Sequence, residues 1–373
     1  MSRLPARDVD GMLREMGDAE RGLPGVLYAN DAVFRCEAET LLATEWMPIG
    51  RADEIPDPGD YLTAELLGEP LVIVRGDDGV VRCFSNICRH RGALIASGSG
   101  NAKRLVCPYH AWSYDRTSGA LVSAPRMKDR IAPSQCDLPA VATEVWQGFI
   151  YVNLDGTAAP LAPRLSALSA RLAPYRTSEM RQVFTGEKVW AANWKAVVEN
   201  FLEAYHLSVV HPSTLHPITP TALARKFDGG AQFTGYCSNY REDAGNRGTG
   251  APELSEAERR RSTLFGVFPG HLVSQAASLL VSFALFPEAA NRTVVRWTIS
   301  VYGDDLSEAE IEERVLLWTT VNEEDRRMLE RTQLGYGSRF AQSGPLADAD
   351  GEGTIADFNR YLRAKLLQPS EAG

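Results

Sequence analysis

The chain has 373 residues, enough for two domains, and its contents of 44% apolar and 23% charged residues are typical of soluble globular proteins. Its formal net charge of −9 at pH 7 disfavours nucleic acid and anionic membranes as partners, because both bind clustered Lys and Arg. No stretch reaches the roughly 18 apolar residues of a membrane span, and the charged residues 1–22 lack the apolar core of a signal peptide. We therefore expect a cytoplasmic protein that binds neither membrane nor nucleic acid.

Within the first 155 residues, the sequence pattern changes near residue 45 from one typical of helices to one typical of short strands. Residues 1–44 are expected to form helical pieces joined by a loop. From 45 to 155, short apolar or alternating runs are separated by turn signals such as RGDDG and SGSGN, which indicates an antiparallel β domain. The strands are expected at residues 61–67, 70–75, 80–86, 104–110 and 148–154.

From residue 156 to 373 the pattern predicts a second domain of mixed helix and strand. Its longest helix should begin at a capping box formed by Ser307 and Glu310. The apolar stretch 272–286 is interrupted by serines and is interpreted as a buried strand. Helices are expected at 161–175, 192–210 and 307–334, strands of one sheet at 232–240, 279–287 and 293–301, and a polar loop at 241–253.

Two cysteines and two histidines stand at metal-ligand spacing within the β domain. Cys88-x-His90 is followed after 16 residues by Cys107-x-x-His110. Such ligands suit zinc or a pair of irons, or they hold no metal. The one-residue gap of the first pair matches no common zinc-finger spacing. A [2Fe–2S] cluster with two His in place of two Cys instead takes one Cys and one His from each of two loops.

A second pair of histidines, His206 and His211, lies in the predicted helix 192–210 and just after it. Five residues correspond to about 140° of rotation on an ideal helix, so the two side chains do not share one face. Pro212 disfavours helical geometry at His211, and a helix that ends or distorts just before that residue would let both imidazoles converge. Two His and one carboxylate on Fe(II) leave open positions for O₂ and substrate.

Together these motifs resemble the Rieske non-haem iron oxygenases, in particular the terminal oxygenase (alpha-type) component of the ring-hydroxylating and quaternary-ammonium family. The resemblance extends over nearly the whole chain. It implies an α+β protein, with a Rieske all-β domain inserted near the N-terminus and a helix-grip (START/Bet v1-like) catalytic domain with an antiparallel sheet. Segment 1–44 would pack on the catalytic domain. Cys88 and Cys107 would hold one iron of the cluster, and His90 and His110 the other.

The resemblance also implies roles for two residues outside these motifs. Asp325, on a late helix, would be the third ligand of the mononuclear Fe(II), with Glu323 and Glu324 as alternatives. Glu203, three residues before His206, matches an acid that links this histidine to a Rieske His of a neighbouring subunit. Most members have Asp there, and Glu resembles the subgroup that acts on carnitine and choline derivatives. Asn200, one turn before Glu203 on the same predicted helix, is a second candidate catalytic residue by its position.

The implied chemistry is reductive activation of O₂. The cluster would pass single electrons to Fe(II), and the enzyme would hydroxylate or oxidatively demethylate a small aromatic or quaternary-ammonium substrate. The chain has no G-x-G-x-x-G after a strand, so NAD(P)H should act only through a separate reductase, with or without a ferredoxin. Electron transfer between protomers implies a ring, most simply a homotrimer.

Several alternatives remain open at this level. The chain could be an aromatic cis-dihydroxylating dioxygenase of hydrocarbon catabolism, a Rieske-type electron carrier without oxygenase activity, or a metal-stapled binding protein. Aromatic residues of the second domain could line a pocket for an arene or bind a trimethylammonium group, although sheet aromatics more often belong to the core. The candidates are Phe227, Phe233, Tyr236, Phe283, Phe286 and Trp297.

Overall fold

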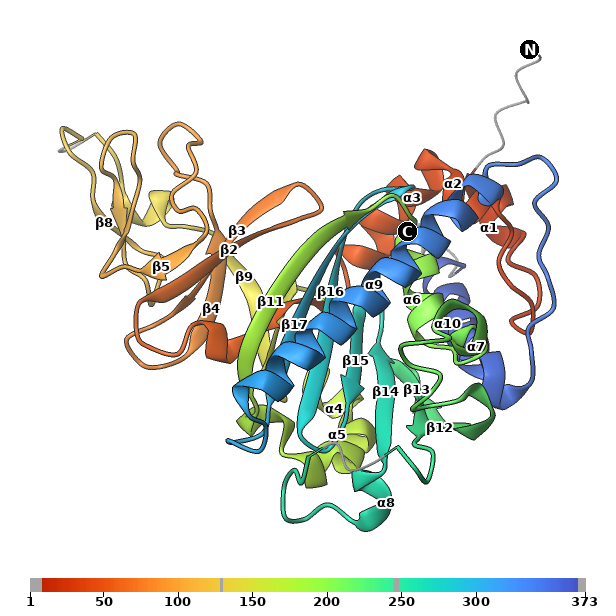
Figure 1. Ribbon diagram of the computed structural model, residues 1–373. Coiled ribbons are helices and arrows are strands. Elements are labelled where there is room, and N and C mark those ends of the chain that lie inside the picture. The colour runs from red at the N-terminus through yellow and green to blue at the C-terminus, as the bar shows by residue number, and fades with distance from the viewer. Residues whose placement is uncertain (1–8, 128–129, 245–247, 368–373) are drawn as a thin grey trace. The chain divides into compact units, whose positions relative to one another are not determined.

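The computed structural model describes residues 9–127, 130–244 and 248–367 (Figure 1). The chain divides into two compact units, one of residues 43–161 and the other of residues 1–42 together with 162–373. The first unit therefore interrupts the second near the N-terminus. Among the described helices, none combines the length and the apolar character that a membrane crossing requires.

The unit of residues 43–161 is built on antiparallel sheets. In the described residues seven strands form one sheet in the order β1-β10-β9-β4-β3-β2-β5, and three short strands form a second in the order β6-β7-β8. The strands are β1 (Met47–Arg51), β2 (Asp60–Leu66), β3 (Glu69–Arg75), β4 (Val81–Ser85), β5 (Ser99–Asn101), β6 (Leu105–Val106), β7 (Ser113–Tyr114), β8 (Leu121–Ser123), β9 (Ala140–Trp146) and β10 (Phe149–Asn153).

Most strands expected in this unit are present, but the strand expected at 104–110 is not. Only Leu105 and Val106 pair there, because the chain turns at Cys107, whose carbonyl accepts a hydrogen bond from the Ala111 amide at 3.1 Å. The second Cys/His pair therefore lies on a loop between two strands.

The larger unit contains an antiparallel sheet of its own, with seven described strands in the order β11-β17-β16-β15-β14-β13-β12. The prediction of a single strand over 272–286 is wrong, because the structure has two strands, β15 and β16, in this stretch. The Ala276 amide donates to the Leu279 carbonyl at 2.8 Å and closes a hairpin between β15 and β16. The strands are β11 (Arg181–Trp190), β12 (Ala224–Gly230), β13 (Phe233–Asn239), β14 (Arg261–Val267), β15 (His271–Gln275), β16 (Leu279–Ala289) and β17 (Arg292–Val301).

Helices cover this sheet, and the longest, α9, crosses one of its faces and packs against β11 (Figure 1). It begins at the predicted capping box, in which the Ser307 and Glu310 side chains each bond the other's backbone amide. The expected α+β fold class is confirmed. The helices are α1 (Val9–Arg14), α2 (Val26–Ala29), α3 (Asp31–Glu37), α4 (Leu161–Arg164), α5 (Ser166–Leu172), α6 (Trp194–Phe201), α7 (Leu207–Val210), α8 (Glu256–Arg259), α9 (Glu308–Tyr336) and α10 (Ala349–Leu366). Single turns of 3₁₀ or π helix occur at Ala38–Leu42, Ala52–Glu54, Pro133–Cys136, Ala173–Tyr175, Thr177–Glu179 and Thr221–Leu223.

The start of α6 is fixed by a buried polar network. Asn193 caps the helix by accepting a hydrogen bond from the Lys195 amide at 3.0 Å. The Trp194 Nε1–H donates to Glu37 at 3.0 Å, and Lys195 Nζ donates to both oxygens of the same carboxylate at 2.7 and 2.9 Å. The Glu37–Lys195 pair is fully buried. It ties the N-terminal helix α3 to the helix that leads into the histidine pair.

Replacing Lys195 with methionine should destabilise the protein by about 3–5 kcal/mol, because it leaves the Glu37 carboxylate buried without a compensating charge. The double variant Glu37→Leu with Lys195→Met should recover most of that loss, since no charge then stays buried. Urea unfolding followed by tryptophan fluorescence measures both. A single variant as stable as wild type would contradict the assignment of this pair.

Candidate metal centres and substrate pocket

Cys88 begins a tight loop in which both its backbone amide and its backbone carbonyl form hydrogen bonds. Its amide donates to the Ala93 carbonyl at 2.9 Å, and its carbonyl accepts from the Gly92 amide at 3.0 Å. Gly92 has a φ of 74°, which a glycine adopts without steric cost.

The loop that begins at Cys107 repeats this pattern residue for residue. The Cys107 amide donates to the Trp112 carbonyl at 2.8 Å, and its carbonyl accepts from the Ala111 amide at 3.1 Å. Ala111 takes the place of the glycine with a φ of 58°, a strained value for a side chain with a Cβ. The two loops thus have the same pattern of backbone hydrogen bonds, and each carries one cysteine and one histidine.

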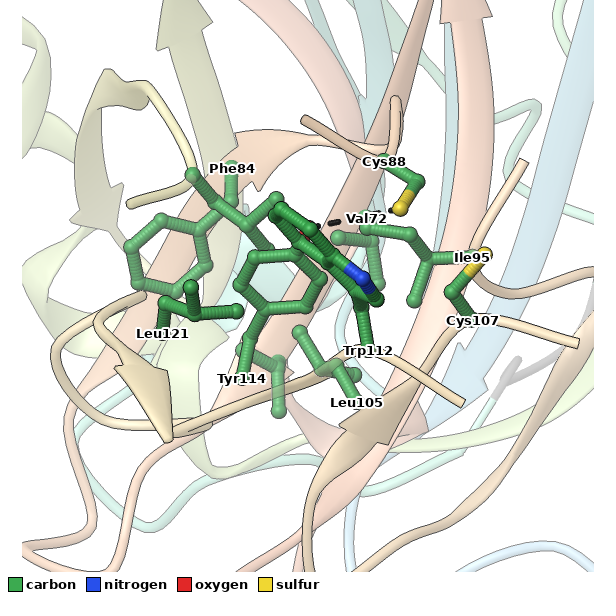
Figure 2. Close-up of a cluster of buried hydrophobic side chains, with 11 residues drawn as sticks. Val72, Phe84, Cys88, Ile95, Leu105, Cys107, Trp112, Tyr114 and Leu121 are labelled. Carbon is green, nitrogen blue, oxygen red and sulfur yellow. Dashed lines mark hydrogen bonds between the residues drawn. The ribbon is translucent and has the colours of Figure 1, made fainter. Parts of the chain in front are cut away.

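Both thiols lie in a hydrophobic cluster of the smaller unit. Figure 2 shows Cys88 and Cys107 at one end of this cluster and Phe84 and Leu121 at the other. Burial raises the pKa of Tyr114, and its hydroxyl lies 3.3 Å from Cys88 Sγ. A protonated tyrosine can therefore donate to this sulfur, a contact of the kind that tunes the potential of iron–sulfur clusters.

The two histidines of these loops lie next to each other. The ring centroids of His90 and His110 are 4.7 Å apart, and His90 stacks on Trp112 with centroids 4.9 Å apart. His90 Nδ1 is buried and has no hydrogen-bond partner among the described residues. Two buried sulfurs and two adjacent imidazoles, one with an unpaired nitrogen, fit a [2Fe–2S] cluster with His on one iron.

The histidine pair of the larger unit follows an earlier helix break than expected. α6 ends at Phe201 rather than just before His211, so Glu203 lies beyond the helix that carries Asn200. The Leu202 carbonyl accepts a hydrogen bond from Thr354 Oγ1 on α10. A short helix, α7 (Leu207–Val210), then separates the two histidines.

This break brings both imidazoles to one carboxylate on α9. Asp325 Oδ1 lies 3.6 Å from His206 Nε2 and 3.0 Å from His211 Nε2. One ligand atom from each of the three residues lies within 4.8 Å of the others. His211 Nε2 is buried and lacks hydrogen-bond geometry to any described partner. Asn200 Nδ2 donates to the same Asp325 oxygen at 3.3 Å.

The outer nitrogen of each imidazole contacts a glutamate. His206 Nδ1 contacts Glu203, and His211 Nδ1 lies 2.7 Å from Glu324 Oε2. Burial lowers the pKa of both histidines, but the neighbouring carboxylates outweigh it and raise each pKa above the ordinary value. Carboxylates at Nδ1 leave both Nε2 atoms free to bind a metal and fix the ring orientations. The set of two imidazoles and one carboxylate fits the facial triad of non-haem Fe(II).

The three acids in a row on α9 have different surroundings. Glu323 forms salt bridges with Lys188, Arg326 and Arg327, and the Arg326 guanidinium holds the pKa of Glu323 well below its usual range. Glu324 contacts the outer nitrogen of one histidine, and only Asp325 of the three contacts both imidazoles. The role of Glu324 was missed in the sequence, because it depends on a residue more than 100 positions away.

Replacing Glu324 with glutamine should weaken Fe(II) binding by about 10- to 100-fold, because the His211 ring loses the carboxylate that fixes its orientation and raises its basicity. Glu323→Gln is the matched control, since its carboxylate faces basic residues, and its Fe(II) affinity should equal that of wild type. Competition with a ferrous chelator in cluster-loaded protein measures both. Equal losses of Fe(II) affinity in the two variants would contradict the role of Glu324 in orienting the His211 ring.

A pocket opens beside this triad in the same unit, with a volume of about 670 Å³ including the part open to solvent. Leu207, which follows His206, is part of its wall. Tyr236 connects the pocket to the triad, because its hydroxyl donates to the Glu203 carbonyl at 3.3 Å. The lining residues are Leu207, Leu215, Ile218, Thr219, Tyr236, Ser238, Tyr240, Ser262, Leu264, Ser274, Ala276, Leu279, Arg314, Leu317 and Trp318.

The expected pocket aromatics are mostly elsewhere. Of the six candidates, Tyr236 alone is among the described lining residues, whereas Tyr240 and Trp318 were not foreseen. One signal could have found Trp318: it lies seven residues before Asp325 on the predicted helix, close to two full turns, and so shares its face.

Comparison with known families and proteins agrees with this geometry. The family described as "Ring hydroxylating alpha subunit (catalytic domain)" matches residues 170–368, and "Rieske [2Fe-2S] domain" matches residues 45–143. The oxygenase subunit of glycine betaine monooxygenase from Chromohalobacter salexigens is 27% identical, with 98% of this chain and 91% of that protein covered. The oxygenase subunit of carnitine monooxygenase from Escherichia coli strain K12 is also 27% identical, with 91% and 92% covered.

A crystal structure of a quaternary ammonium Rieske monooxygenase with an inhibitor matches with a TM-score of 0.83 and 25% identity, covering 98% of this chain and 99% of that one. Two centres with fitting donor sets, and a catalytic-domain match over more than half the chain, establish the class of protein. The chain belongs to the ring-hydroxylating oxygenase alpha subunits: it is a Rieske terminal oxygenase that uses a [2Fe–2S] cluster, a mononuclear iron and O₂, with electrons from a separate reductase.

Proposed function

We propose that this oxygenase oxidises a quaternary ammonium compound, with His206, His211 and Asp325 holding its ferrous ion. The observation that carries the site assignment is the contact of both Nε2 atoms with one Asp325 oxygen, 3.6 and 3.0 Å away. In this assignment Cys88, Cys107, His90 and His110 hold the cluster. Iron in the triad supplies the activation of O₂.

The surrounding residues of the chain orient the ligands and the substrate. Glu203 and Glu324 fix the two imidazoles at Nδ1, and Asn200 fixes the Asp325 carboxylate by its 3.3 Å hydrogen bond. Tyr236 belongs both to the pocket wall and to the network behind His206. The substrate would lie against this tyrosine with the carbon to be oxidised toward the open positions of the triad.

Three observations favour a trimethylammonium substrate. The pocket wall carries Tyr236, Tyr240 and Trp318, and aromatic faces attract quaternary ammonium groups by cation–π interaction. Glu203 stands where the resemblance associates Glu with the quaternary-ammonium subgroup. Two relatives that match along most of their length are named for glycine betaine and carnitine. In the reaction one oxygen atom enters a C–H bond next to nitrogen, and the other leaves as water, formed with two electrons from the reductase and two protons from solvent.

The second candidate is cis-dihydroxylation of an arene. The large oxygenase component of the naphthalene 1,2-dioxygenase system from Pseudomonas putida is 36% identical over 214 residues, covering 55% of this chain and 47% of that protein. Oxygen uptake with a surrogate reductase and a panel of arenes and methylammonium compounds separates the two. We expect uptake and a dealkylated or hydroxylated product with the ammonium compounds. A cis-diol from an arene, with no ammonium turnover, would reverse the assignment.

We also propose a ring of subunits, most simply a homotrimer, in which Glu203 faces a Rieske histidine of the next copy. Exposed apolar side chains flank each centre, which favours contact with a partner: Tyr205 beside His206 is 61% exposed, and Tyr109 beside His110 is 57% exposed. Light scattering should give about three times the chain mass of 40.9 kDa. A monomer at micromolar concentration would contradict this assembly.

A further inference from the structure

One face of α9 combines the metal site and the pocket. Trp318 and Arg314 lie seven and eleven residues before Asp325, which places each of them within about 20° of Asp325 around an ideal helix. Arg314 lies three turns before Asp325, about 16 Å along the helix axis. Trp318 and Arg314 both line the pocket. The pocket wall therefore follows α9 from Arg314 to Trp318, and Asp325 of the triad lies about two turns beyond Trp318 on the same face of the helix.

Arg314 is the one charged residue among the described residues that line this pocket. It is half-buried, and no carboxylate of the described residues forms a salt bridge with it. The closest acid on the same face, Glu310, is engaged elsewhere, because its carboxylate accepts hydrogen bonds from the Ser307 amide at 2.9 Å and the Ser307 hydroxyl at 2.7 Å. Only a longer-range attraction connects Arg314 with Glu310.

We propose that Arg314 binds an anionic group, a carboxylate, at the end of the substrate that lies away from the oxidised carbon. The inference rests on the proposed function for the order of the groups: the ammonium head lies near Trp318 and the triad, and the carboxylate lies near Arg314. A guanidinium forms paired, charge-assisted hydrogen bonds with a carboxylate. It also repels a cation that carries no negative group. Arg314 thus selects zwitterions over purely cationic trimethylammonium compounds.

The test compares matched acids and methyl esters in two series. One pair is 4-(trimethylammonio)butanoate and its methyl ester, and the other is a benzoate and its methyl ester. The value of kcat/KM is measured by oxygen uptake with a surrogate reductase for wild type, Arg314→Gln and Arg314→Lys. Arg331→Gln is the matched control, because Arg331 is exposed on the same helix and lies about 120° away from Asp325 around its axis.

We expect wild type to prefer the acid over its ester by about 10- to 100-fold, the range that charged hydrogen bonds provide. Arg314→Gln should lose this preference through a higher KM for the acid, with kcat at saturation close to wild type. The KM of the cationic ammonium ester should fall, because the repelling charge is gone, and the KM of the neutral benzoate ester should change little. Arg314→Lys should recover part of the preference, and Arg331→Gln should behave as wild type. Iron and sulfide contents equal to wild type exclude misfolding of the variant.

Two failures can be told apart with this design. An equal rate for acid and ester in wild type, or an unchanged preference in Arg314→Gln, overturns the role of Arg314. Turnover of the aromatic series alone overturns the ammonium proposal, and the acid-to-ester ratio in that series still tests Arg314. If neither series is turned over, the rise in Tm on adding each compound measures binding. A Tm rise with the acids that is lost in Arg314→Gln supports the inference, and equal rises with acids and esters overturn it.

Discussion

Replacing Asp325 with alanine is expected to remove the mononuclear iron and abolish oxygen uptake, while the [2Fe–2S] cluster remains bound. Asp325 is the one carboxylate of the described chain in contact with both Nε2 atoms, at 3.6 and 3.0 Å. Without it, two neutral imidazoles hold a divalent ion whose third ligand site is empty. The residues proposed to hold the cluster lie in the other compact unit, so we expect this substitution to leave them unchanged.

Three readouts test this expectation. Iron content should fall by one ion per chain, the visible absorbance of the cluster should stay at the wild-type level, and turnover should fall by more than about 1,000-fold. Glu323→Ala is the control, because its carboxylate pairs with Lys188, Arg326 and Arg327 rather than with the histidines, and it should keep its iron. Full iron content and activity in Asp325→Ala would show that another acid is the ligand.

Replacing Glu203 with alanine is expected to stop electron transfer to the mononuclear site in iron-replete protein. Glu203 is 8% exposed, and its carboxylate contacts His206 Nδ1 and accepts from the His206 amide at 3.0 Å. The substitution should therefore also weaken iron binding by about 10- to 100-fold, as for other carboxylates behind a ligating histidine. Loss of the proposed electron-transfer bridge between subunits is a second effect, and it can be measured separately from the weaker iron binding.

The separation uses protein loaded with excess Fe(II). The reduced cluster is mixed with substrate and O₂, and its reoxidation is followed by visible absorbance in stopped flow. With iron restored, a residue that only orients His206 would permit wild-type reoxidation, whereas a bridge would leave the cluster reduced for at least 100 times longer. Glu203→Asp, with a shorter carboxylate, should recover part of the rate. Wild-type reoxidation in iron-replete Glu203→Ala would remove the bridge from the account.

The sequence was most informative where ligands and scaffold are local. Cys88-x-His90 and Cys107-x-x-His110 are each complete within a loop of a few residues, and the strands around them are short apolar runs between turns. The capping box at Ser307 is likewise a contact of neighbouring residues, and α9 begins where it predicts. Such contacts join residues that are close in the sequence, so the spacing of the residues is enough to predict them.

Long-range contacts were not predictable in the same way. The break of α6 at Phe201 lies beside the contact of Thr354, on a helix about 150 residues later, with the Leu202 carbonyl. Glu324 acquires its role from His211, and the pocket uses Tyr240 of one segment with Trp318 of another. None of these pairs has a spacing to recognise. Periodicity alone also merged β15 and β16, because both strands are buried on both sides and the turn between them is short.

The most direct test of the central claim is the metal and acid-labile sulfide content of anaerobically purified wild-type protein. Two separate iron centres predict about three iron atoms and two sulfides per chain. A ferrous chelator should remove one iron and leave the coloured cluster, and added Fe(II) should restore oxygen uptake. Zinc in either site, or two irons per chain in protein that is fully active, would contradict it.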